Sequence, residues 1–441
     1  MHIIFRQTCR VCGSPHLLPV IDLGLQYLQG SFLKDGVPPP PLRKIPTCLV
    51  RCDVSKSETA CGLLQLAHTL PPEILYANYW YRSGTNATMR EHLKEIVSSV
   101  LAISGLKSGC VLDIGCNDGT LLTCYPPGFT LIGVDPSDIA LEVPPSVRLV
   151  NALFPSPALF GALEGKKVDI VTSIAMFYDL EDPCAFAKSV ADVLTPTGIW
   201  VMEMSYLPLM LDRNSFDTIC HEHLEYYSLA VIENILRRVG LRLFKAELTD
   251  INGGSIRCYI TNADNMAYDT IEAKEYLHRL RVHEFEQELD SNAPYQEFQK
   301  RIERLRDDLQ AKLRKLKSAG KRIHVYGAST KGNVLLQWCG IGADVIDCAA
   351  DRNPIKNGAR TLGTNIPIVL EEESRALKPD AYLVLPWHFK KEFLERERAA
   401  IQGGTMMIFP LPHLTVVDAS NLDEVLSAVK KNPFDDDLPP R

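Results

Sequence analysis

Residues 109–119 read GCVLDIGCNDG, and this stretch decides the fold of the chain around it. Its first half is an apolar run of strand length, and its second half is a glycine turn that lets backbone approach a ligand closely. Residues 129–136, FTLIGVDP, form a second expected strand, and 168–176 and 198–206 form two more. Helical stretches such as 183–194 lie between them, and this alternation predicts a doubly wound parallel sheet.

The turn after the first strand carries the expected cofactor site. The second strand ends at Asp135 and Pro136, and a carboxylate there can accept hydrogen bonds from both hydroxyls of a ribose. The turn lacks a full GxGxxG and begins with an early acid, so it resembles S-adenosylmethionine (SAM) methyltransferases more than NAD enzymes. NAD binding stays open as the alternative. The expected residues of the turn are Asp113, Gly115, Asn117 and Gly119.

Composition narrows the class of protein. The chain has 441 residues, 46% hydrophobic and 23% charged, which excludes a mainly disordered, collagenous or coiled-coil protein. A net charge of −7 offers no basic surplus, so we expect no nucleic-acid partner. No apolar run reaches the length of a membrane span, and the first residues, MHIIFRQTCRVCG, do not resemble a secretory signal. We therefore expect a cytoplasmic enzyme.

The N-terminal cysteines suggest a metal site. Cys9 and Cys12 form a CxxC pair, and Cys52 and Cys61 can complete a tetrahedral four-thiolate site. Four thiolates leave no open position, so the expected zinc is structural. Cys48 competes with Cys52 for the third position. Unpaired buried thiols are the alternative.

Residues 216–228, FDTICHEHLEYYS, follow the fourth expected strand and supply the candidate catalytic groups. His221 and His223 would share a face in an extended turn, on either side of Glu222. This spacing differs from the HExxH of a helical zinc site, so we interpret the group as acid–base machinery. A neutral histidine abstracts a proton near pH 7, and the carboxylate orients it or stabilises its charged form.

Two further stretches are candidates for ligand binding. Residues 78–90, NYWYRSGTNATMR, gather polar and aromatic groups that could line a small pocket, although a surface linker would look the same. Residues 326–333, YGASTKGN, place hydroxyls and a lysine in a glycine turn before a helix. Such a turn can bind a phosphate group through its backbone amides and the lysine, although it lacks the Walker A pattern. An ordinary strand-to-helix turn is the alternative. The candidates are Tyr79, Tyr81 and Ser83 in the first stretch, and Tyr326, Ser329, Lys331 and Asn333 in the second.

The hydrophobic pattern of the remaining sequence divides the chain into five expected parts. Residues 301–320 show apolar positions at helical spacing, which predicts an amphipathic helix packed on a neighbouring domain. From Lys321 the strand–glycine–helix pattern restarts as a second α/β unit. The expected parts are 1–75, a zinc-binding module; 76–265, a SAM-binding domain; 266–320, a helical linker; 321–415, a Rossmann-like domain; and 416–441, a helix and tail.

Taken in order, the motifs resemble a known family. CRVCG, YRSGTNATMREH, LDIGCNDG, FDTICHEHLEYYS, INGGSIR and YGASTKGN occur along the chain as they do in zinc-containing nucleotide-sugar C-methyltransferases of deoxysugar biosynthesis. The resemblance runs from about Cys9 to Pro412. It implies an α/β fold with an N-terminal zinc module, a Rossmann-like class I SAM methyltransferase domain, a helical linker and a second Rossmann-like domain that helps hold the nucleotide sugar.

The resemblance also implies an activity and its residues. The family transfers a methyl group from SAM to C3 of a 4-keto-6-deoxy sugar carried on a nucleoside diphosphate, usually dTDP. It implies an active-site pair at Glu222 and His223, with Tyr79 or Tyr81 on the substrate side. The zinc ligands fall on Cys9, Cys12, Cys52 and Cys61. A small-molecule nucleotide sugar is the expected partner, and the chain could work as a monomer.

The sequence departs from the family at three places. Eight residues separate Cys52 from Cys61, where the family usually has a CxxC. Cys220 stands where a tyrosine is often found. Ala175 and Asp179 stand where the family often has Asn and His, so we expect Cys220 and Asp179 to contact an altered substrate. O- or N-methylation of a sugar or related metabolite is the alternative reaction, and ligand binding without catalysis is a further one.

Overall fold

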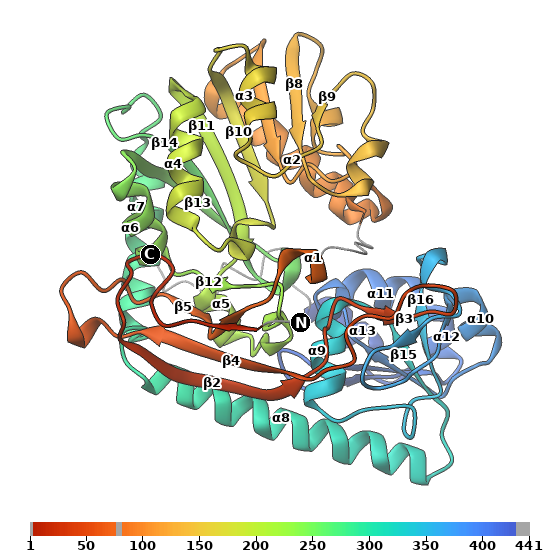
Figure 1. Cartoon of the computed structure of the whole chain (residues 1–441). Coiled ribbons are helices and arrows are strands. Elements are labelled where there is room, and N and C mark those ends of the chain that lie inside the picture. The colour runs from red at the N-terminus through yellow and green to blue at the C-terminus, as the bar shows by residue number, and fades with distance from the viewer. Residues whose placement is uncertain (1–2, 76–81, 429–441) are drawn as a thin grey trace.

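The computed structural model describes residues 3–75 and 82–428 of the chain. Three sheets make up most of it (Figure 1). A seven-stranded sheet lies at the top of that view, a four-stranded sheet built largely from the N-terminal segment lies below it, and a six-stranded sheet belongs to the C-terminal part. The expected Tyr79 and Tyr81, and the tail after residue 428, lie outside the described residues.

The seven-stranded sheet has the order β13-β14-β11-β10-β7-β8-β9. Strands β7, β8, β9, β10 and β11 run parallel to one another. At one edge, β14 pairs antiparallel with β11, and β13 pairs antiparallel with β14. The strands are β7 Gly109–Ile114, β8 Phe129–Val134, β9 Arg148–Val150, β10 Val168–Ile174, β11 Leu194–Ser205, β13 Leu241–Thr249 and β14 Ser255–Asn262. This arrangement confirms the expected doubly wound α/β fold.

Helices cover both faces of this sheet because its central strands are apolar on both sides. Val111 packs in the core under α2, whereas Leu112 belongs to the core on the opposite face, with α3, α4 and α6. The helices are α2 Ala87–Ser104, α3 Pro157–Leu163, α4 Pro183–Val193, α5 Leu207–Asp212 and α6 Leu229–Arg238. Short 3₁₀ turns are η2 Ser83–Thr85, η3 Leu122–Cys124, η4 Asp138–Glu142, η5 Phe177–Asp179, η6 Phe216–Thr218 and η7 Ile251–Gly253.

The N-terminal module is an antiparallel sheet of order β12-β5-β4-β2. Its edge strand β12 comes from the segment that follows the HEH sequence, so the predicted catalytic loop continues directly into this sheet. A second pair, β3 with β17, joins the module to the C-terminal part. The elements are β1 Ile4–Phe5, β2 Leu17–Gln26, β3 Phe32–Leu33, β4 Ile45–Cys52, η1 Val54–Lys56, β5 Leu64–Leu66, β6 His68–Thr69, α1 Pro72–Leu75 and β12 Glu225–Tyr226.

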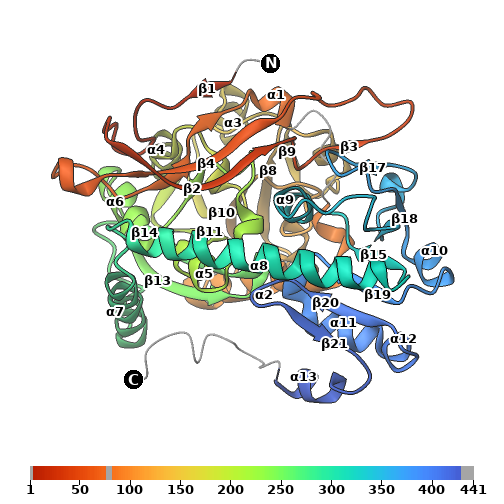
Figure 2. The same ribbon diagram turned by 90° about the horizontal axis from the view of Figure 1, so that it is seen from below.

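Two helices, α7 Ile271–Glu286 and α8 Ala293–Ser318, connect the seven-stranded sheet to the C-terminal part. Helix α8 has 26 residues, a length of about 39 Å. Figure 2 shows it running beneath β2 toward β15. Ile302, Leu309 and Leu313 are buried, and Leu305 and Leu316 pack partly buried against the same core. The predicted amphipathic helix is thus confirmed.

The C-terminal sheet has the order β18-β16-β15-β19-β20-β21, parallel except for β21. The strand order reverses beside β15, which is where such sheets bind ligands. Its elements are β15 Ile323–Tyr326, α9 Thr330–Trp338, β16 Cys348–Asp351, η8 Pro354–Lys356, β17 Arg360–Thr361, β18 Ile368–Leu370, α10 Glu371–Ala376, β19 Ala381–Val384, η9 Trp387–Phe389, α11 Lys390–Arg396, α12 Arg398–Gln402, β20 Met406–Phe409, β21 Thr415–Val417 and α13 Leu422–Ala428.

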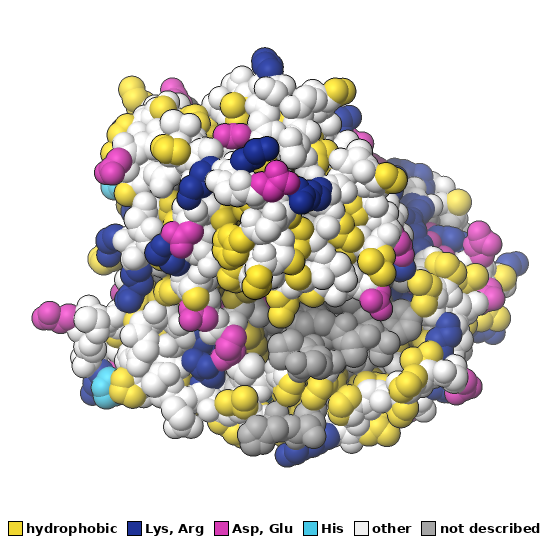
Figure 3. Space-filling view, turned by 45° about the horizontal axis from the view of Figure 1, so that its top comes forward, with side chains coloured by type: hydrophobic (Ala, Val, Ile, Leu, Met, Phe, Trp, Pro, Cys, Tyr) yellow, Lys and Arg dark blue, Asp and Glu magenta, His cyan; other side chains and the backbone are white. Residues whose placement is uncertain are grey.

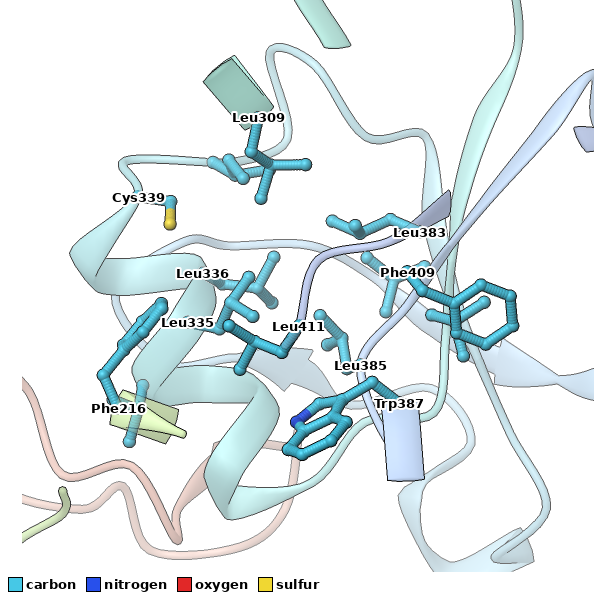
Figure 4. Close-up of a cluster of buried hydrophobic side chains, with 14 of the residues drawn as sticks. Phe216, Leu309, Leu335, Leu336, Cys339, Leu383, Leu385, Trp387, Phe409 and Leu411 are labelled. Carbon is cyan, nitrogen blue, oxygen red and sulfur yellow. The ribbon is translucent and has the colours of Figure 1, made fainter. Parts of the chain in front are cut away.

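One apolar core joins the parts. Phe216 of η6 and Leu309 of α8 lie with Leu335 and Leu336 of α9 in the same buried cluster (Figure 4). Trp387 adds a polar contact, because its Nε1 donates a hydrogen bond of 3.0 Å to Asp217. The loop that carries the HEH sequence is therefore held between the parts of the protein.

The surface carries both signs of charge. On the face shown in Figure 3, Lys and Arg side chains are mixed with Asp and Glu. Among the described residues, no helix has both the length and the apolar character needed to cross a membrane.

Candidate active site

The four expected cysteines come together in the N-terminal module. The Sγ atoms of Cys9, Cys12, Cys52 and Cys61 all lie within 4.8 Å of one another, with Cys9–Cys61 and Cys12–Cys52 at 3.5 Å. Thiolates about 2.3 Å from a tetrahedral zinc ion are about 3.8 Å apart, so this donor set fits zinc. Cys48 lies four residues from Cys52 on β4, about 13 Å along the strand, and is outside the cluster.

Local backbone geometry builds the cysteine cluster. The amide of Cys9 donates to Ser14 O, and that of Gly13 donates to Cys9 O, both at 2.9 Å. Gly13 has a φ of 72°, a left-handed conformation that glycine adopts without strain. The amide of Cys52 donates to Leu63 O at 2.9 Å, which brings the second pair of cysteines near the first.

The glycine turn lies at the carboxyl ends of β7 and β8. Gly115, Asn117 and Gly119 all have positive φ, which the turn requires. The amide of Asn117 donates to Asp135 Oδ2 at 2.9 Å, and the amide of Ser83 donates to Asn117 Oδ1 at 2.9 Å. The structure thus brings together the predicted cofactor residues, with Pro136 exposed beside them.

Two acids at this turn differ in environment. Thr172 Oγ1 donates to Asp113 Oδ1 at 2.5 Å, and burial raises the pKa of Asp113 to about 7. Asp135 Oδ1 accepts from the amide and the hydroxyl of Ser137 at 2.8 and 2.6 Å. A carboxylate has about four acceptor sites, so Asp135 can order the turn and still accept from a ribose. The turn, its glycines and this acid fit SAM.

His223 lies in a partly buried position on the HEH loop. Its Nδ1 is 2.7 Å from Thr218 O, and its ring centroid is 4.2 Å from that of Tyr178. A carbonyl oxygen only accepts, so Nδ1 carries the hydrogen and Nε2 is the basic nitrogen. Burial, and then the charge of Lys331, lower the pKa of His223 to about 3, so its resting form is neutral.

His221 points elsewhere. Its Nε2 lies 3.2 Å from Thr47 Oγ1 and 3.3 Å from Pro46 O, and its ring centroid is 5.6 Å from that of His68. The side chain is 1% exposed, and burial lowers its pKa to about 3. The expectation that both histidines share one face is therefore wrong, because β4 takes His221 into the N-terminal module.

Glu222 and Asp179 are neighbouring acidic residues at the HEH loop. The amide of Leu224 donates to Tyr178 O at 2.7 Å, which ties the HEH loop to η5. Burial raises the pKa of Glu222 to about 7. Burial, and then the charge of Glu222, raise the pKa of Asp179 well above its ordinary value. Glu222 can therefore hold a proton near neutral pH, and burial likewise favours the protonated form of Asp179.

The fully buried Cys220 lies in the shared core, so its thiol packs among apolar groups. Burial raises its pKa well above the ordinary value, with a smaller contribution from Glu222. The expected contact of Cys220 with substrate stays a prediction.

The four candidates of the 326–333 turn separate. Lys331 donates to Asn252 O and thus faces the seven-stranded part. Asn333 Nδ2 donates to Gln29 O at 2.6 Å, and Ser329 caps α9 by accepting from the amide of Gly332. Tyr326 is 1% exposed, and its hydroxyl bonds to Glu397 inside the C-terminal part, so its expected contact with a ligand is not supported.

Three residues near the HEH loop were missed by sequence reasoning. His388 follows β19, and its Nδ1 is buried without a hydrogen-bond partner among the described residues; burial and then Lys331 lower its pKa to about 3. Its place after a parallel strand is a signal that could have found it. Gln29 and Gly30 contact the HEH loop from the N-terminal module, and no local pattern marks them.

Models of known protein families match three successive parts of the chain. Residues 9–76 match the family model described as "Putative zinc binding domain", residues 86–246 match "Methyltransferase domain", and residues 250–412 match "C-methyltransferase C-terminal domain". C-methyltransferase NovU from Streptomyces niveus is 30% identical over 422 residues, which are 94% of this chain and 97% of NovU.

Among solved structures, an S-adenosylmethionine-dependent methyltransferase from Clostridium acetobutylicum matches with 15% identity and a TM-score of 0.32, covering 39% of this chain and 92% of that one. Magnesium protoporphyrin IX methyltransferase from Synechocystis matches with 16% identity and a TM-score of 0.32, covering 42% of this chain and 90% of that one.

Proposed function

Because this chain belongs to the SAM-dependent C-methyltransferase family, we propose that it methylates C3 of a 4-keto-6-deoxy sugar carried on a nucleoside diphosphate, with dTDP as the expected carrier. Family membership favours carbon over the oxygen or nitrogen acceptors that the fold alone allows. The observation that supports the proposal most is His223. Its Nδ1 is engaged by Thr218 O, so a neutral imidazole keeps Nε2 as a base.

Deprotonation is the first step we assign. The carbonyl at C4 acidifies the proton on C3, and Nε2 of His223 takes that proton. The electrons of the broken C–H bond pass into an enolate whose charge lies mainly on the C4 oxygen. Glu222, adjacent in sequence, stabilises the imidazolium that forms, provided that its carboxyl group is ionised.

Lys331 is our candidate for stabilising the enolate. One of its three donors bonds to Asn252 O, and its charge acts on both His223 and His388. An ammonium group beside the base lowers the energy of an anion formed there. We therefore propose that Lys331 contacts an anionic oxygen of the substrate.

Methyl transfer completes the reaction. The turn between β7 and β8, with Asn117 and Asp135, would hold SAM, which would supply an electrophilic methyl group on its positively charged sulfonium. The enolate carbon forms the new C–C bond as the C–S bond breaks, and the C4 carbonyl is restored. The proton on His223 then passes to water.

The proposal is tested by mass spectrometry of the protein incubated with SAM and dTDP-4-keto-6-deoxyglucose, with the product then reduced by borohydride. A gain of one methyl group on C3 is the expected result. A sugar that gains no methyl group, or gains it on oxygen, would reject the proposed substrate or position.

A further inference from the structure

Gly30 of the N-terminal module lies directly against Glu222. An ideal Cβ atom built on Gly30 would lie 1.9 Å from Glu222 Oε1 and 3.0 Å from Cδ, much closer than real Cβ atoms approach. Gly30 is not among the glycines with positive φ, so backbone conformation does not require glycine here. The missing side chain instead makes room for the carboxyl group.

Gln29, the residue before Gly30, holds the backbone next to Glu222 through two hydrogen bonds. Gln29 Oε1 accepts from the amide of His221 at 3.2 Å, and Gln29 O accepts from Asn333 Nδ2 at 2.6 Å. Gln29 is only 1% exposed. The backbone at Gly30 is thus held between the HEH loop and α9, and it cannot easily withdraw from Glu222.

The groups around Glu222 give the contact a chemical effect. Asp179 faces it from η5, Cys220 lies two residues earlier on its own loop, and His221 and His223 flank it as neutral imidazoles. None of these is a cation, and Lys331 acts on His223 rather than on Glu222. Burial therefore acts without a compensating positive charge and raises the pKa of Glu222 to about 7.

We propose that Gly30 is a positioning residue for Glu222, and that its backbone packs against the half-buried carboxyl group, limits its access to water and fixes its position next to His223 in the HEH loop. The inference rests on the proposed function, because it gives Glu222 a part in the reaction. It also makes the N-terminal module a wall of the active site in addition to a zinc-binding unit.

The test is Gly30→Ala in the full-length protein. The atom in conflict is the end of a flexible side chain, so the variant should fold and bind zinc and SAM as the wild type does. Displacing Glu222 by an ångström or more should lower kcat on the order of 10²-fold. Gly161→Ala is the matched control, since an added Cβ there meets nothing within 4 Å.

The pH profile separates positioning from a general structural defect. If catalysis needs ionised Glu222, wild-type kcat rises with pH through a midpoint near 7, and Glu222→Gln removes that limb. In Gly30→Ala the displaced carboxyl group should be more exposed to water, and the midpoint should fall toward about 4.3. A kcat and a midpoint equal to those of the wild type would overturn the proposal.

Two additional arms keep the inference testable. Glu222→Asp shortens the side chain, so Gly30→Ala should cost much less in that background, and additive losses would count against the contact. If the wild type methylates no keto sugar, the proposed function fails independently. A crystal structure of Gly30→Ala then decides: a displaced Glu222 carboxyl group supports the inference, and an unmoved one rejects it.

Discussion

The Nδ1 atom of His223 lies 2.7 Å from the carbonyl oxygen of Thr218, five residues earlier in the same loop. This contact selects the tautomer in which Nε2 is basic, and it fixes the orientation of the ring. Tyr178, whose ring centroid is 4.2 Å from that of His223, restricts the ring further. The base that we propose is therefore oriented by backbone and by an aromatic neighbour before any substrate binds.

Replacing His223 by Asn should abolish most turnover. The Asn amide can still donate toward Thr218 O, but it has no basic nitrogen, so we expect kcat to fall about 10²–10⁴-fold. The dissociation constant of SAM, measured by calorimetry, should change less than about twofold because the turn after β7 is untouched. His278→Asn, on the exposed face of α7, is the control. Turnover retained by His223→Asn would remove His223 as the base.

Removing a zinc ligand should unfold the N-terminal module. Cys61→Ser leaves three thiolates, so metal analysis should find zinc lost, and the melting temperature should fall because metal binding stabilises such modules. Since β12 of the HEH segment pairs with β5, kcat should fall as well. Cys48→Ser should keep both zinc and melting temperature. Equal zinc loss in the two variants would contradict the ligand set.

Asp135 should control SAM affinity. Asp135→Ala removes the acceptor for the Asn117 amide and the proposed acceptor for the ribose, and charged hydrogen bonds contribute about 1.5–3 kcal/mol each. We expect the dissociation constant to rise at least about tenfold by calorimetry. Asp169→Ala is the matched control, because Asp169 accepts from the amide of Cys110 at the other end of β7. Equal effects would indicate a general loss of the sheet.

A buried ion network should contribute strongly to stability. Arg257 Nε bonds to Glu203 Oε2 at 2.8 Å, and both side chains are almost fully buried. Arg257→Met leaves the Glu203 carboxylate with His92 alone, and breaking such a pair costs about 3–5 kcal/mol. Urea denaturation should show this loss, whereas exposed Arg237→Met should change the unfolding free energy by less than about 0.5 kcal/mol. Equal losses would contradict the assignment.

Much of the fold could be predicted from sequence because its causes are local. Apolar runs that end in glycine turns marked both parallel sheets, and cysteine spacing marked the metal site. The glycine turn and Asp135 were predictable for the same reason, since the residues that end each strand follow it directly in the sequence.

The arrangement around the HEH loop could not be predicted, because its contacts join segments that are distant in the sequence. His221 is drawn away from His223 by Thr47, 174 residues earlier. Gly30 is an unmarked loop residue until the fold brings it against Glu222. Tyr326 was predicted to belong to a ligand-binding turn. In the structure its hydroxyl donates a hydrogen bond to Glu397, 71 residues later, in the core of the C-terminal part.

Methylation at C3 is tested most directly with a 4-keto-6-deoxy nucleotide sugar that carries deuterium on C3. The sugar is incubated with SAM and the wild-type protein, and the product is examined by mass spectrometry, with an enzyme-free sample to correct for spontaneous exchange. Carbon methylation through the enolate predicts a product that gains a methyl group and loses the C3 deuterium. A methylated product that retains this deuterium would rule out methylation at C3.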